Sequence, residues 1–181
     1  MFKSSVLAGA VIALAVGCAH QDGNQPPLRT VEHVDVQRYL GTWYEIAAIP
    51  QRFEKGCFGS VATYALRDDG MLSVTNRCRK GSLDGPESVA NGRARIVDTR
   101  TNAKLKVGFW GPFWGDYWII GLGENYEYAV VGHPNRKYLW ILSRLPTMDE
   151  ALYQDLLTRV AAQGYDVNRI ERMPQRSQPA S

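Results

Sequence analysis

Chemically reactive side chains are few in this 181-residue sequence, and their spacing argues against catalysis. Asp68 and Asp69 are adjacent, but they precede Gly70 in a run typical of a solvated hairpin turn. The three histidines are scattered, and no metalloprotease, nucleophile-elbow, P-loop or dinucleotide-binding motif is present. We therefore expect a protein that is not an enzyme and that holds no metal and no cofactor.

Cys57 and Cys78 have a spacing that predicts a disulfide bond. The runs on either side of Arg67–Gly70 should form a hairpin, because this glycine accepts a positive φ. A three-residue loop places Phe58 opposite Cys78, so Cys57 is one place from direct opposition, and a bulge near Gly56 would bring the sulfurs together. An exported protein meets an oxidising compartment, which favours the bond over two free thiols. Two cysteines and scattered histidines do not make a zinc site.

The first 18 residues predict an export signal that ends in an acylation site. Lys3 precedes an apolar run, Val6–Val16, that is too short to span a bilayer comfortably. The run Leu14-Ala15-Val16-Gly17-Cys18 resembles the bacterial lipobox, in which the cysteine is acylated, for example with palmitate, and begins the mature lipoprotein. Ala19 follows instead of aspartate, and resemblance to enterobacterial sorting rules then implies the outer membrane, facing the periplasm. Ordinary secretion is the alternative.

The rest of the chain divides into a tether, one domain and a tail. We expect a signal peptide at 1–17, the acylated Cys18 with a flexible tether to residue 30, a folded domain at 31–172, and a disordered tail at 173–181. The folded length suits a single domain with a sizeable core. The formal net charge of +3 is too small to indicate a nucleic-acid partner.

The pattern of apolar runs and turn residues predicts that the folded domain has eight short strands followed by a helix. No helix of crossover length separates the strands, so the sheet should be antiparallel, all-β and up-and-down. A capping box from Thr147 to Glu150 should begin an amphipathic helix of about 16 residues that ends near Gly164 and packs on the outside. A short last strand could follow at 165–171. The expected strands are 43–49, 58–66, 71–79, 88–98, 103–109, 116–122, 126–132 and 137–144.

Gly41, Trp43 and Arg144 are the residues that we expect to close the sheet into a barrel. Trp43 opens the first strand after a glycine, and Arg144 ends the last long strand. A guanidinium over an indole ring is a favourable cation–π pair, which would make the first and last strands neighbours. An eight-stranded barrel has an interior that can hold one small ligand.

Alternation along the strands predicts an apolar, aromatic interior. Such a lining favours acyl chains, although the same side chains could simply fill the barrel. The expected ligand-binding residues are Ala62, Tyr64, Val74, Asn76, Val107, Phe109, Ile120, Tyr138 and Trp140.

These motifs together resemble the lipocalin family, and within it the bacterial outer-membrane lipocalins. The resemblance rests on Gly41-x-Trp43-Tyr44, Tyr126-x-Tyr128, Arg144, the run 134–144 and Phe109-x-Gly111-Pro112-Phe113, and it covers about residues 31–172. Glu124-Asn125 stands where the family usually has Thr-Asp. The resemblance implies a membrane-anchored carrier of a fatty acid or lysophospholipid, for storage or transport in envelope maintenance. The alternatives are a lipocalin-fold enzyme, a haem or pigment binder using Tyr64 or Tyr138, and a structural envelope protein with a filled barrel.

One aromatic cluster, Phe109–Trp114, is left without an assigned role. It falls between two expected strands, in a turn where packing of the core does not require aromatic residues. Exposed aromatic clusters mark interaction sites, so these residues could form a lip at the cavity mouth, contact the membrane or mediate a homodimer. Packing against the barrel rim is the alternative.

Overall fold

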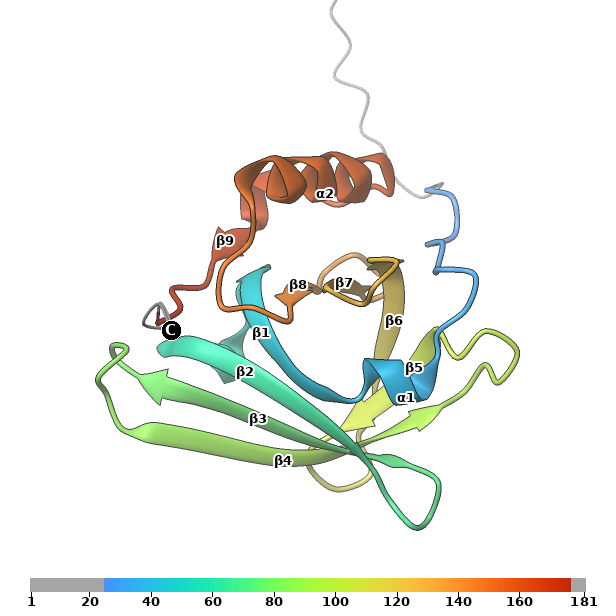
Figure 1. Cartoon of the computed structure of the whole chain (residues 1–181), viewed down its shortest axis with the longest axis horizontal. Coiled ribbons are helices and arrows are strands. Elements are labelled where there is room, and N and C mark those ends of the chain that lie inside the picture. Colours follow the sequence, from blue (N-terminus) through green and yellow to red (C-terminus); the bar gives the residue numbers. More distant parts are fainter. Residues whose placement is uncertain (1–24, 177–181) are drawn as a thin grey trace, which may run out of the picture.

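The computed structural model describes residues 25–176, which form a closed antiparallel barrel with one helix on its outside (Figure 1). Neighbouring strands follow the chain from β2 to β8, β8 then pairs with β1, and β1 pairs with β2 to complete the cylinder. This confirms the eight-stranded up-and-down barrel. The strands are β1 (Gly41–Ala48), β2 (Cys57–Leu66), β3 (Leu72–Lys80), β4 (Glu87–Ile96), β5 (Lys104–Gly108), β6 (Gly115–Leu122), β7 (Tyr128–Gly132), β8 (Leu139–Ser143) and β9 (Glu171–Arg172).

Four helical segments complete the described chain. α1 (Val36–Tyr39) precedes β1, and the one-turn helix η1 (Arg52–Glu54) lies between β1 and β2. α2 (Glu150–Ala162) follows β8, and η2 (Val167–Arg169) precedes β9. Within residues 25–176, no helix is both long enough and apolar enough to cross a bilayer.

The buried residues form two clusters, one on each side of the sheet. The first fills one end of the barrel interior and includes Trp43, Tyr64 and Leu105. The second lies between α2 and the outer faces of β1, β6, β7 and β8, and it includes Ile141 and Leu156. Figure 1 shows α2 lying along this side of the barrel. Strands under the helix are therefore apolar on both faces, and all five residues of β7 are buried.

The N-terminus of α2 differs from the predicted capping box. Asp149 is the N-cap, and its carboxylate accepts a hydrogen bond from the Leu152 amide at 3.0 Å. The prediction that Thr147 caps the helix was wrong, because the helix begins at Glu150 and runs for 13 residues. A carboxylate at this position also complements the positive end of the helix dipole. Gly164 follows the C-cap with a φ of +87°, as a helix-ending glycine should.

The β2–β3 hairpin has a longer loop than predicted, and the disulfide forms nevertheless. Leu66 pairs with Leu72, so the predicted three-residue loop and its register were wrong. A bulge between Phe58 and Val61 then shifts the register by one residue. The bond between Cys57 and Cys78 is present, with the two Cα atoms 5.4 Å apart, and this prediction is confirmed.

Both ends of the described chain are attached to the barrel. Leu28 is buried in the cluster beneath α2, and Arg136 donates a hydrogen bond to the Pro26 carbonyl. The last residues of the predicted tether, 25–30, thus pack on the domain because an apolar side chain is available to bury; its earlier residues and Cys18 lie outside the described range.

The C-terminal segment 171–176 lies along a gap between β1 and β2. These strands pair only from Gly41 to Tyr44 of β1, and beyond that point the tail supplies the missing partners. β9 pairs with Ala47 and Ala48, and the Gly59 amide donates to the Pro174 carbonyl. Gln175 Nε2 donates to the backbone carbonyls of Glu45 and Ser60, 2.8 and 2.9 Å away. Residues 173–176 of the expected disordered tail are therefore hydrogen-bonded, and 177–181 lie outside the described residues.

Candidate functional site

One end of the barrel is closed by Trp43 and Arg144. The Trp43 side chain is fully buried, and its indole Nε1 donates to the Tyr39 carbonyl at 2.9 Å. The Arg144 guanidinium lies 3.7 Å from the centre of the indole ring. It donates to the carbonyls of Arg38 in α1 at 2.7 Å, of Thr42 in β1 at 2.8 Å and of Tyr126 at 3.3 Å, so one side chain joins α1 and β1 to the segment that precedes β7.

Gly41 is required by the backbone at this closed end. Its φ is +91°, a conformation that side-chain-bearing residues adopt only with strain. An added Cβ would lie 3.5 Å from Nη1 of Arg144, which is an ordinary contact distance. The positive φ, and not a lack of space, is therefore what selects glycine here.

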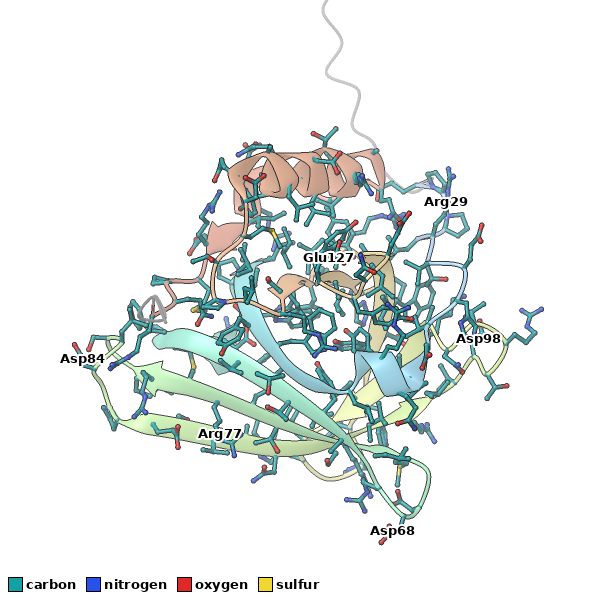
Figure 2. The ribbon with its side chains drawn as sticks, in the orientation of Figure 1. Arg29, Asp68, Arg77, Asp84, Asp98 and Glu127 are labelled. Carbon is teal, nitrogen blue, oxygen red and sulfur yellow. A yellow bond between two sulfur atoms is a disulfide. The ribbon has the colours of Figure 1, made fainter. Side chains whose placement is uncertain are left out.

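A cavity of about 290 Å³ occupies the other part of the barrel and opens between the loops at the far end from α1. Figure 2 marks the two ends of the β2–β4 sheet by Asp84, in the turn on the cavity side, and Asp68, in the turn on the closed side. Seven of the nine predicted ligand-binding residues line this cavity: Ala62, Tyr64, Val74, Asn76, Val107, Phe109 and Trp140. Their contact with a ligand remains a prediction.

Ile120 and Tyr138 do not line the cavity, so these two predictions were wrong. Ile120 belongs to the cluster beneath α2, whereas its neighbour Ile119 belongs to the interior cluster. Both faces of β6 are buried there, and apolar character alone could not tell them apart. Tyr138 precedes β8 in a turn, is 37% exposed and stacks against Trp140 at the rim.

Three tyrosine hydroxyls meet at the inner end of the cavity. Tyr117 is hydrogen-bonded to Tyr39 at 2.8 Å and to Tyr64 at 2.9 Å. Burial raises the pKa of all three phenols, and it raises the pKa of Tyr64 to about 12. Ionising any of these three hydroxyls is therefore disfavoured in the protein alone.

Sequence reasoning missed two carboxyl groups in the cavity wall. Glu45 of β1 is 6% exposed, and Glu54 of η1 lies close enough to influence its ionisation. Burial raises the pKa of Glu45 well above its usual value, and the charge of Glu54 raises it further. Burial also raises the pKa of Glu54, opposed by a 3.4 Å hydrogen bond from Trp140 Nε1 and by the charge of Lys80. The cavity is thus less apolar than predicted.

The aromatic cluster at 109–114 lies at the cavity mouth and divides into two sets. Phe109 and Trp110 line the cavity and contact each other, while Trp114 packs on the outside under Arg93 and Arg95. Trp110 and Phe113 are 68% and 79% exposed. Phe53, on the facing loop, is also exposed, so the mouth has an apolar rim.

The chain is similar to known proteins over most of its length. A model of the lipocalin-like domain matches residues 34–175. The outer membrane lipoprotein Blc of Escherichia coli K12 is 42% identical over 167 residues, covering 91% of this chain and 92% of Blc. The temperature-induced lipocalin-1 of Arabidopsis thaliana is 37% identical over 84% of this chain and 85% of its own length. The structure of insecticyanin from Manduca sexta has the same fold, with a TM-score of 0.67 at 20% identity over 85% of this chain and 87% of insecticyanin.

Proposed function

This chain belongs to the lipocalin family, and we propose that it is a lipid-anchored carrier of one single-chain lipid, a fatty acid or a lysophospholipid. The observation that carries the proposal is the cavity of about 290 Å³, which is open at one end and closed at the other. Its walls are largely apolar, with Ala90, Val74 and Val107 among the lining residues. Each buried methylene of an acyl chain gains about 0.8 kcal/mol, so such a cavity favours long chains.

The proposed place of action is the outer membrane, with the barrel facing the periplasm. The relatives named outer membrane lipoproteins support the membrane, and the lipobox-like run ending at Cys18 supports the anchor. The carrier would then store or move lipid during envelope maintenance. A Cys18→Ser change in the full chain should move the protein from the membrane fraction to the soluble periplasmic fraction, and retention in the membrane would contradict the anchor.

Native mass spectrometry followed by lipid extraction tests the carrier function. Residues 25–176 contain the closed barrel and both buried clusters, so a protein beginning at Ala19 retains the whole fold. We expect a bound single-chain lipid on the purified protein, and the same spectrum reports whether a homodimer forms. A barrel that is empty and that also fails to take up added acyl lipids would overturn the carrier function.

Two neighbouring positions on β4 provide a matched pair of variants. Ala90 lines the cavity, whereas Val89 is 46% exposed and is absent from the cavity lining. Ala90→Trp should fill the cavity and weaken binding of a fluorescent acyl probe at least tenfold. Val89→Trp adds the same ring to the outer face and should leave probe binding unchanged. Equal binding by both variants would place the lipid elsewhere.

A further inference from the structure

One sector of the cavity wall is polar, and several of its groups have no hydrogen-bond partner in the described part of the chain. It consists of Glu45 of β1, Glu54 of η1, Ser60 of β2 and Asn76 of β3, which all line the cavity. Ser60 Oγ and Asn76 Oδ1 are buried and make no hydrogen bond within residues 25–176. Ser60 is 8% exposed and Glu45 is 6% exposed. Buried polar atoms are nearly always paired, so a cluster of unpaired ones indicates a ligand that supplies the missing bonds.

The polar sector is rich in hydrogen-bond acceptors. In the described part of the chain, no backbone or side-chain group donates a hydrogen bond to the Glu45 carboxyl, and Glu54 accepts only the long bond from Trp140. Ionised carboxylates and the amide oxygen of Asn76 can accept but not donate, and the Ser60 hydroxyl can do both. Acceptors outnumber donors in this sector, so a ligand group that donates several hydrogens would satisfy it best.

Few positive charges within the protein support ionisation of the two carboxyls in this sector. Lys80 is the cation that acts on Glu54, but its Nζ donates instead to the Lys55 carbonyl and to Cys57 Sγ, both at 3.2 Å. Arg77 of β3 also borders the cavity, but it is exposed on the outward face of the strand. Burial raises the pKa of both carboxyls because it makes their ionised forms costly, and a cation bound beside them would favour ionisation.

We propose that Glu45, Glu54, Ser60 and Asn76 form a subsite for the primary ammonium group of a single-chain lipid. This inference rests on the proposed carrier function and names the head group that the carrier selects. An ammonium group offers three N–H donors to a wall of acceptors and neutralises the carboxylates. Lys80, which lines the same cavity, supplies positive charge for a phosphate beside the ammonium. The preferred cargo is thus a zwitterionic lysophospholipid with a primary amine.

The same geometry disfavours the two closest competitors. A quaternary ammonium has no N–H group, so it leaves Glu45, Ser60 and Asn76 without a hydrogen-bond donor. A fatty acid carboxylate would be repelled by Glu45 and Glu54 unless protons were taken up. Discrimination against an analogue that lacks the donor is large when the site's own polar groups are then left unpaired.

Displacement of a fluorescent acyl probe by three lipids with the same acyl chain tests the subsite. The lipids are lysophosphatidylethanolamine, lysophosphatidylcholine and the free fatty acid, each below its critical micelle concentration. The wild-type protein beginning at Ala19 should bind the ethanolamine lipid at least tenfold more tightly than either of the others. Glu45→Gln, which keeps the side chain's size and removes its charge, should reduce this preference to less than threefold.

Glu87→Gln is the matched control, because Glu87 is an exposed carboxylate on β4 that pairs with Arg79 outside the cavity lining. It should retain the wild-type preference. Equal affinities for all three lipids, or a preference unchanged by Glu45→Gln, would overturn the subsite while leaving the carrier function intact. Tightest binding of the free fatty acid would likewise overturn it. Failure of every lipid to displace or replace the probe would instead contradict the carrier function itself.

Discussion

Replacing Arg144 by alanine should destabilise the barrel without weakening lipid binding. The variant loses the contact with the Trp43 ring at 3.7 Å and three hydrogen bonds to backbone carbonyls. A cation–π contact at a partly exposed site is worth about 0.5–1 kcal/mol. The three bonds contribute about 1 kcal/mol each before water replaces some of them, since the guanidinium is partly exposed. We expect a loss of about 2–3 kcal/mol in the free energy of unfolding.

Urea unfolding followed by tryptophan fluorescence measures this loss, with the slope of the transition compared between variants. Arg144→Met keeps an apolar stem over the indole and removes the charge and the donors, so it separates apolar packing on Trp43 from the cation–π contact and the hydrogen bonds taken together. Arg100→Ala is the control: its side chain is 90% exposed, and its removal should cost less than about 0.5 kcal/mol. Since Arg144 lies outside the cavity lining, the affinity for an acyl probe should stay at the wild-type value. An unfolding midpoint unchanged in Arg144→Ala would refute the closure argument.

Two further predictions concern the cavity end of the barrel. The double variant Cys57→Ser, Cys78→Ser should have a free energy of unfolding about 3 kcal/mol lower than that of the wild type, by the chain-entropy model for a sequence separation of 21. A urea midpoint equal to that of the oxidised wild type would contradict this prediction. Burial raises the pKa of Glu45 in the folded state above its ordinary value of about 4.3. Between these two pKa values the folded protein binds more protons than the unfolded protein. The free energy of unfolding therefore falls as the pH rises through this range. Glu45→Gln should therefore flatten the pH dependence of the urea midpoint in lipid-free protein and raise the midpoint at pH 7, and a lowered midpoint at pH 7 would refute the assignment.

The sequence predicted the order of the strands because turn residues separate them clearly. Asp69 and Gly70 mark the β2–β3 hairpin, and Trp43 with Arg144 indicated that the first and last barrel strands are neighbours. The loop length, in contrast, depended on how Asp69 bonds: its carboxylate accepts from Arg67 and from the Met71 amide, which stabilises a wider turn. Local hydrogen bonds of this kind set the register, and composition alone does not reveal them.

The residues that face the barrel interior were predictable where the other face of the strand is exposed to solvent. On β3, Val74 faces inward and Arg77 outward, and the alternation is plain. On β6 it failed at Ile120, because α2 buries the outer face as completely as the barrel buries the inner one. Because the prediction took the face of Ile120 as the inward face of β6, it also missed Tyr117, which lies on the other face and lines the cavity.

The two carboxyl groups of the cavity were harder to predict, for different reasons. Glu45 follows Trp43 by two residues, so alternation along β1 does place it on the inward face, and this signal was available. Burial of an unpaired carboxylate is costly, however, and that rule argued against it. Glu54 carries no such signal, because it lines the cavity from η1, outside any strand and its alternation.

The position of the C-terminal segment beside the cavity determines where a tag or reporter can be attached. Gln175 bridges β1 and β2 beside Glu45 and Ser60, and Arg176 pairs with Asp84 in the turn that Figure 2 marks at the cavity end. A purification tag or fluorescent protein fused after residue 181 would be tethered next to the lipid entrance. Removing residues 173–176 would leave backbone groups of β1 and β2 unpaired at the cavity wall. Reporters for lipid uptake are therefore better placed in the exposed Asp68 turn, at the opposite end of the barrel.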